Sequence, residues 1–129
     1  MAYRILVVDD EPDIRQLVAL ILESAGHEIM TVSSGKEALY SLEQDDYHLV
    51  ILDIMMPEMD GWEVCRQIKG RSRTKDLPVV FLTVRGQPLD RVIGLEVVHA
   101  DGYVTKPFER DQLLSTINCC LTCVATQTQ

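Results

Sequence analysis

The chain has 129 residues, of which 47% are hydrophobic and 25% are charged, a length and balance that suit one globular domain with a substantial core. Its formal net charge of −8 excludes sequence-independent binding to nucleic acid or to an anionic membrane, because both require clustered cations. No apolar run approaches the ~20 residues that cross a bilayer, and the N-terminus lacks a signal-peptide layout. A cytoplasmic protein is therefore predicted.

Short apolar runs and helical periodicities alternate along the chain. The runs are rich in β-branched residues and predict buried strands at 4–8, 27–32, 48–53, 77–83 and 101–106. Helices are predicted from Pro12 to a cap at Gly26, after Ser33 or Ser34, at 62–69, at 88–98 and after Pro107. The alternation predicts an open (βα)₅ sheet of parallel strands with helices on both faces. Its commonest strand order is 2-1-3-4-5, with a topological switch point between the first and third strands.

Acidic side chains follow the two strands that meet at this switch point. Asp9 and Asp10 come after the first predicted strand, and Asp53 ends the third. Neighbouring strands lie ~4.8 Å apart, so these carboxylates should converge on one ion. An all-oxygen ligand set favours Mg²⁺, with Mn²⁺ as the alternative. The competing interpretation is that Asp9 and Asp10 only lead into a helix whose N-terminus favours acids.

The fourth and fifth predicted strands end in Thr83 and Lys106. A hydroxyl and an ammonium group are thus delivered to the same edge of the sheet as the acids. Together these groups are suited to holding a metal ion and a phosphoryl group.

At this point the sequence resembles the response-regulator receiver domains of two-component signalling, which have a flavodoxin-like fold. The resemblance covers residues 3–122 and rests on four segments: ILVVDDEPDIR at 5–15, LVILDIMMPEMDGWEV at 49–64, PVVFLT at 78–83 and ADGYVTKPF at 100–108. Residues 1–124 are accordingly expected to form the domain, and residues 125–129 a disordered tail.

The resemblance implies that Asp53 accepts a phosphoryl group from a histidine kinase or a phosphotransfer protein. It implies that Asp10, Asp53 and the backbone carbonyl of Met55 bind Mg²⁺ directly, while Asp9 acts through a water molecule. The protein would then be a regulator that catalyses only its own phosphorylation and dephosphorylation.

The same resemblance assigns the switching residues. Thr83 and Lys106 would contact phosphoryl oxygens, and the Lys106–Pro107 peptide bond would be cis, a form essentially reserved for proline. Thr83 would move on phosphorylation and let Tyr103 turn inward. This movement would change the face built from the fourth helix, the fifth strand and the fifth helix.

Several positions depart from the family pattern or vary within it. Val84 stands where Ala, Ser or Gly is common, and His99 stands where Gly is common. Met55 and Arg85 occupy two positions that tune the lifetime of the phosphate in the family. We hypothesise restricted access to the phosphate and an altered lifetime.

Other functions are weaker matches. An aspartyl-phosphate phosphatase would need a second acid where Met55 stands, and an FMN-binding protein would need a Ser/Thr/Gly-rich loop in place of residues 9–13. A receiver-like interaction module that no longer switches stays open, as do the output, the partner and a phosphorylation-dependent homodimer.

Two further features are expected to be structural. The cysteines at 65, 119, 120 and 123 lack the paired spacing of a zinc site and are interpreted as small, partly buried helix residues. The basic run at 69–75 is interpreted as a solvated connection after a helix.

Overall fold

The computed structural model describes residues 2–54, 56, 58–84, 101–106 and 108–127. Its strands are β1 (Arg4–Val8), β2 (Glu28–Val32), β3 (Leu49–Asp53), β4 (Val79–Val84) and β5 (Gly102–Lys106). Its helices are α1 (Pro12–Ser24), α2 (Gly35–Gln44), α3 (Gly61–Lys69) and α5 (Arg110–Gln127). The helix predicted at 88–98 lies outside the described residues.

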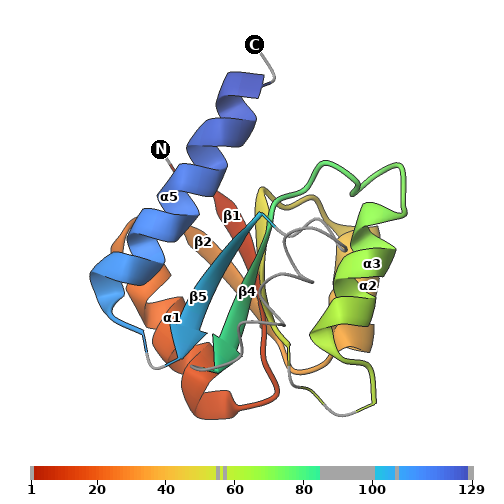
Figure 1. The fold of residues 1–129 in the computed structure, drawn as a ribbon, viewed down its shortest axis with the longest axis horizontal. Helices are drawn as coiled ribbons and strands as arrows, with labels where there is room; N and C mark the ends of the chain where they lie inside the picture. The colour runs from red at the N-terminus through yellow and green to blue at the C-terminus, as the bar shows by residue number, and fades with distance from the viewer. Residues whose placement is uncertain (1, 55, 57, 85–100, 107, 128–129) are drawn as a thin grey trace.

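All strand pairs are parallel, and the sheet order is β2-β1-β3-β4-β5, which confirms the predicted fold class and order. Helices α1 and α5 lie on one side of the sheet, and α2 and α3 lie on the other (Figure 1). In the register of β1 with β3, Val8 lies opposite Leu52, so Asp9 and Asp53 follow at the same edge. This edge is the switch point where crossovers leave in opposite directions.

Two hydrophobic clusters, one on each side of the sheet, explain why the central strands β1 and β3 are almost continuously apolar. In β1, Ile5 and Val7 pack with residues of α1 and α5, while Leu6 and Val8 pack with residues of α2 and α3. All four side chains are fully buried. Successive strand residues point to opposite faces, so a strand covered on both sides cannot alternate apolar with polar residues.

Local signals fix both ends of α1 and the start of α2. Pro12 occupies the first turn of α1, and Gly26 has the positive φ of 94° that suits a glycine after a helix end. Ser34, and not Ser33, caps α2 by accepting a hydrogen bond from the backbone N–H of Glu37 at 3.2 Å. These caps place the start of α1 and the start of α2 beside the carboxyl ends of β1 and β2.

Helix α5 continues to Gln127 and so includes part of segment 125–129, where a disordered tail was expected. The division of the chain at residue 124 stays a prediction.

The basic run at 69–75 was only partly understood from the sequence. Arg71 forms an ion pair with Glu43 at 3.1 Å, and Arg73 forms one with Asp46 at 2.9 Å. The hydroxyl of Thr74 is buried and donates a hydrogen bond to the carbonyl of Ile68 at 2.6 Å. The two ion pairs are exposed and join the end of α3 to the end of α2 at the surface, so the run is the solvated connection that was predicted, apart from the buried Thr74.

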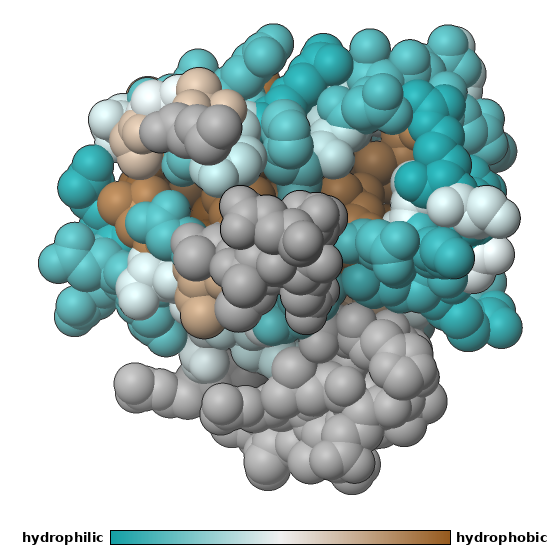
Figure 2. Space-filling view, turned by 90° about the horizontal axis from the view of Figure 1, so that it is seen from above, coloured by the Kyte–Doolittle hydropathy of each residue, from teal (hydrophilic) through white to brown (hydrophobic). Residues whose placement is uncertain are grey.

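The surface in Figure 2 is largely hydrophilic where it is described, with hydrophobic residues visible in recesses between the polar ones. Four large hydrophobic side chains are classed as exposed among the described residues: Leu17, Leu20, Met30 and Tyr40. Among the described helices, none combines the length and the apolar character that crossing a membrane would require.

Candidate functional site

The predicted acidic cluster forms at the carboxyl ends of β1 and β3. Oxygen atoms of Asp9, Asp10 and Asp53 all lie within 4.8 Å of one another. Asp9 is fully buried, Asp53 is 4% exposed and Asp10 is half-buried. The sequence order and the parallel pairing of β1 with β3 are sufficient to bring these residues together.

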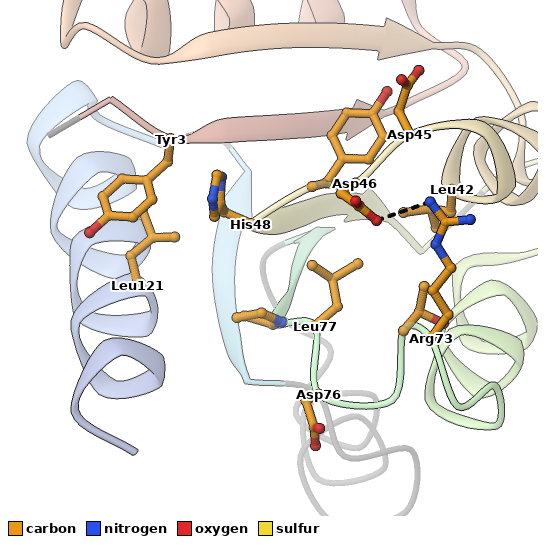
Figure 3. Close-up of a pocket in the computed structure, with 12 residues that line it drawn as sticks. Tyr3, Leu42, Asp45, Asp46, His48, Arg73, Asp76, Leu77 and Leu121 are labelled. Atoms are coloured by element: carbon orange, nitrogen blue, oxygen red, sulfur yellow. Dashed lines mark hydrogen bonds and ion pairs between the residues drawn. The ribbon is translucent and has the colours of Figure 1, made fainter. Parts of the chain in front are cut away.

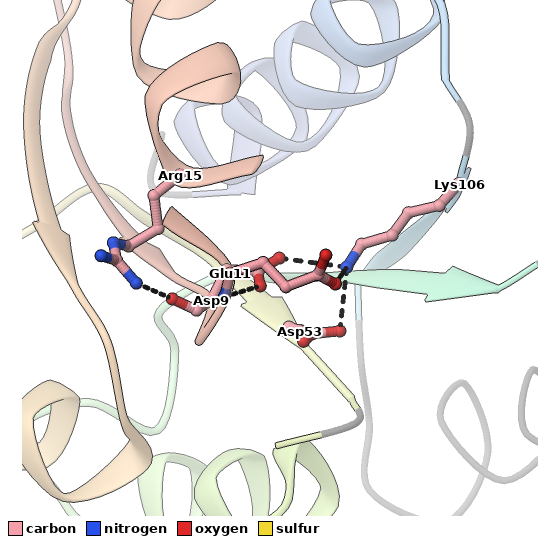
Figure 4. A network of polar contacts seen from close by, with 5 residues as sticks. All are labelled: Asp9, Glu11, Arg15, Asp53 and Lys106. Atoms are coloured by element: carbon pink, nitrogen blue, oxygen red, sulfur yellow. Dashed lines mark hydrogen bonds and ion pairs between the residues drawn. The ribbon is translucent and has the colours of Figure 1, made fainter. Parts of the chain in front are cut away.

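Lys106, at the end of β5, reaches across the edge of the sheet into this cluster (Figure 4). Its Nζ lies 3.1 Å from Asp9 Oδ2, 3.3 Å from Asp53 Oδ1 and 3.7 Å from Glu11 Oε1. Burial by itself would lower the pKa of Lys106, but the carboxylates of Asp53 and Asp9 outweigh it and raise that pKa above its usual value. The side chain is therefore an ammonium ion at neutral pH.

Asp9 is held at each of its polar groups. Its Oδ1 accepts the backbone N–H of Glu11 at 2.9 Å, and its Oδ2 accepts from Lys106. Its backbone N–H donates to Val32, and its carbonyl accepts from Arg15 Nη1 at 2.6 Å. No sequence pattern predicts the contacts of Glu11 and Arg15, because both depend on how the loop turns after β1.

Asp10 differs from its neighbour. Among the residues that the structure describes, its carboxylate has no hydrogen bond or ion pair, although two other carboxylates lie close to it. Three carboxylates facing one ammonium ion leave negative charge that only a cation can offset. The oxygen-only donor set and its net charge fit a hard divalent ion such as Mg²⁺.

The remaining predicted residues lie along β4 and β5 or outside the described residues. Thr83 lies opposite Thr105 in the sheet, and Val84 lies opposite Lys106, so both are at the same edge as the acids. Tyr103 is half-buried and packs against Phe81, with ring centroids 5.6 Å apart. The predictions on Met55, Arg85, His99 and the Lys106–Pro107 bond lie on residues outside the described ones.

The chain also has a hollow of about 360 Å³ at the opposite edge of the sheet (Figure 3). Tyr3, His48 and Pro78, which precede β1, β3 and β4, line it together with Leu121 of α5. Its rim carries the ion pair between Arg73 and Asp46. Because it lies at the amino ends of the strands, it is separate from the acidic cluster.

The cysteines that the structure describes act as small helix residues. Cys65 and Cys120 are buried and Cys119 is exposed. Burial raises the pKa of Cys65 to about 11. The side chain of Cys123 lies outside the described residues.

The fold and the site together define a class: a doubly wound α/β protein with an acidic cluster and a lysine at its switch point. The sequence model of the response regulator receiver domain family matches residues 5–118. The chain belongs to this family and is a receiver domain of a two-component response regulator.

Individual relatives agree with this assignment. Over 114 residues the chain is 44% identical to the transcriptional regulatory protein TcrA of Mycobacterium tuberculosis, covering 88% of this chain and 44% of TcrA. A response regulator from Chloroflexus aurantiacus superposes with a TM-score of 0.91 at 30% identity, covering 95% of this chain and 99% of that one. The chemotaxis response regulator CheY4 of Vibrio cholerae gives a TM-score of 0.87 at 33% identity, covering 93% and 99%. The chain spans less than half the length of curated relatives such as TcrA.

Proposed function

We propose that the chain is a phosphoacceptor switch in which Asp53 accepts a phosphoryl group from a histidine kinase or a phosphotransfer protein. The main support for this proposal is that the side chains of Asp53, Asp10 and Lys106 lie close together at the switch point of the sheet. Asp53 is almost fully buried, so its carboxylate is fixed in one direction by the end of β3. A cytoplasmic location belongs to the same proposal.

The metal in this proposal is Mg²⁺, with Mn²⁺ as a substitute. Asp10, Asp53 and the backbone carbonyl of Met55 would hold it, and Asp9 would contact it through water. When bound, the ion supplies positive charge that offsets the carboxylates and the oxygens of the incoming phosphoryl group.

The chemical step requires a nucleophile and a cation from the chain itself. An oxygen of Asp53 attacks phosphorus in line, and the bond from phosphorus to the donor's imidazole nitrogen breaks as the acyl phosphate forms. Lys106 already touches Asp53 Oδ1 at 3.3 Å, so a small movement of its ammonium group would bring it to a phosphoryl oxygen. Asp9 keeps Lys106 at this edge throughout, because the backbone N–H of Glu11 holds its other oxygen.

The switching step would involve Thr83 and Tyr103. Thr83 would donate to a phosphoryl oxygen, and Tyr103, now half-buried against Phe81, would move further inward. The face formed by the predicted helix at 88–98, β5 and α5 would change, and the partner or a phosphorylation-dependent homodimer would recognise it. Met55, Val84 and Arg85 would set the lifetime of the phosphate.

The test is incubation of the chain with acetyl phosphate and Mg²⁺, followed by intact mass spectrometry. We expect one added phosphate on the wild type and none on Asp53→Asn. Asp76→Asn is the matched control, because Asp76 is exposed and lines the hollow at the opposite edge. No adduct on the wild type would favour the interaction module that no longer switches, and an undiminished adduct on Asp53→Asn would refute Asp53 as the acceptor.

A further inference from the structure

Arg15, at the start of α1, forms an unusual bond to the acidic loop. Its guanidinium Nη1 donates to the backbone carbonyl of Asp9 at 2.6 Å in a half-buried position (Figure 4). A charged donor at this distance makes one of the stronger hydrogen bonds available to a carbonyl. The bond fastens the end of β1 to the first turns of the helix that follows.

This carbonyl belongs to the peptide unit that joins Asp9 to Asp10. A peptide unit is planar, so fixing the direction of its carbonyl also fixes the backbone from which the Asp10 side chain leaves. The carboxylate of Asp9 is secured by Glu11 and Lys106, whereas that of Asp10 has no bond among the described residues. The position of Asp10 therefore depends on its backbone, which is held before Asp10 by Arg15 and after it by the bond from the Glu11 N–H to Asp9 Oδ1.

We propose that Arg15 is a positioning residue, which sets the place of the Asp10 carboxylate for a divalent cation. The proposal rests on the Mg²⁺ site of the proposed function and adds a residue that does not touch the ion. The positive charge of Arg15 by itself would weaken the binding of a cation, so this role is the opposite of what the charge predicts.

Charge and position predict opposite effects on the affinity for Mg²⁺. Removal of a cation from the edge of an acidic cluster strengthens the attraction of the cluster for a divalent ion. Removal of the hydrogen bond lets the Asp9–Asp10 peptide rotate and moves a ligand out of place, which weakens binding. The sign of the change therefore separates the two effects.

The charge of Arg15 also acts on Glu37, and this offers a structural alternative. The pKa of Glu37 is lowered by hydrogen bonds from Ser33 and Ser34 and, to a smaller extent, by the charge of Arg15. The charge of Arg15 thus also reaches the start of α2. If Arg15 acted by bracing α1 against α2, Glu37→Gln would reproduce the effect of its removal.

The experiment is a Mg²⁺ titration of the full chain followed by tryptophan fluorescence. The chain has one tryptophan, Trp62, at the start of α3 and packed against Phe81 of β4 at a centroid distance of 4.7 Å. The variants are Arg15→Met, which keeps the aliphatic stem, and Arg15→Lys, which keeps a charge and a donor. Glu37→Gln tests the alternative, and Lys36→Met tests the loss of an exposed cation elsewhere.

We expect Arg15→Met to raise the dissociation constant of Mg²⁺ about tenfold, the lower end of what outer-shell partners of metal ligands contribute. Arg15→Lys should recover most of the affinity. Lys36→Met should leave the affinity unchanged or slightly higher, and Glu37→Gln should leave it unchanged or slightly lower. Unchanged or tighter binding by Arg15→Met refutes the positioning role, as does weaker binding by Glu37→Gln of the same size. If Arg15→Met does not fold, Arg15→Gln decides, because it removes the charge and shortens the side chain: wild-type or tighter binding of Mg²⁺ by Arg15→Gln would refute the role.

The two proposals fail in different ways. A wild-type chain without any response to Mg²⁺ would overturn the metal site itself. A wild-type response with no loss in Arg15→Met would overturn only the role of Arg15.

Discussion

The charge imbalance of the acidic cluster predicts that Asp10→Asn makes the metal-free protein more stable. Asp10 lies within 4.8 Å of both Asp9 and Asp53, and its carboxylate has no bonded partner among the described residues. Asparagine has nearly the same shape and removes only the charge. The folded state should therefore lose repulsion without losing packing.

The size of the effect follows from Coulomb's law. Two unit charges 4.8 Å apart repel by about 0.9 kcal/mol in water and about 3.5 kcal/mol at an effective dielectric constant of about 20. Lys106 offsets roughly one of the two repulsions on Asp10, and the half-buried position of Asp10 moves the other toward the lower value. We expect a gain of about 1–2 kcal/mol, which corresponds to about 4–7 °C for a chain of this size.

The assay is thermal unfolding in EDTA and again with excess Mg²⁺. Mg²⁺ should stabilise the wild type by about 2.7 kcal/mol at a hundredfold excess over its dissociation constant, and should stabilise Asp10→Asn much less. The variant would then be the more stable protein without the ion and would lose this advantage when Mg²⁺ is added.

Asp13→Asn is the matched control, because Asp13 is an exposed acid in the first turn of the same helix. Its carboxylate favours the helix N-terminus, so its loss should cost about 0.5 kcal/mol. A melting temperature of Asp10→Asn equal to or below that of the wild type in EDTA would refute the repulsion argument.

Three further predictions concern other parts of the fold. Gly61→Ala should lower the free energy of unfolding in urea by about 1–3 kcal/mol, because the new Cβ would lie 2.5 Å from the carbonyl oxygen of Asp53. Gly70→Ala should lower it less, because the nearest atom to its Cβ would be 3.2 Å away. Equal losses of stability in the two variants would contradict this reason. Cys65, buried and with its pKa raised to about 11, should escape iodoacetamide at pH 8 while exposed Cys119 is alkylated; peptide mapping that finds both modified would contradict it. Burial and the nearby N-terminus lower the pKa of His27 below 6.5, so the unfolded chain takes up this proton first and stability should fall as pH drops below about 6.5. His27→Gln should reduce that fall in urea midpoints between pH 7.5 and 5.5, and an unchanged slope would contradict it.

The fold could be predicted from the sequence because a sheet that is covered by helices on both faces produces a strong pattern of hydrophobic residues. A strand covered on both faces is a continuous apolar run, and each such run here ends in a polar residue at the edge where the site forms. Strand order then placed Asp53 beside Asp9 and Asp10 without knowledge of any side-chain conformation. The acidic cluster was predictable for the same reason as the fold.

Contacts between charged side chains far apart in the sequence were not predictable. Arg71 and Arg73 are exposed, as predicted, but the sequence did not indicate that they pair with Glu43 and Asp46, which lie 27 or 28 residues earlier in the chain. Local periodicity has no information about such pairs, since many exposed acids would serve equally well as partners. The hydrogen bond from Arg15 to the Asp9 carbonyl could not be predicted for a different reason. Its acceptor is a main-chain atom, which every residue has, so no side-chain type in the sequence marks it.

The contacts of Lys106 suggest how a change at Asp53 would reach the far side of the sheet. Lys106 ends β5, an edge strand, yet its ammonium group lies against Asp9 after β1 and Asp53 of β3. Tyr103 is on the same five-residue strand and packs on Phe81 of β4. A phosphoryl group on Asp53 would draw Lys106 away from the carboxylate oxygen it now contacts, and a strand this short transmits such a pull to Tyr103. Because Asp9 is fixed at all of its polar groups, the movement would be taken up on the other side of the contact, by the Lys106 side chain and then by β5.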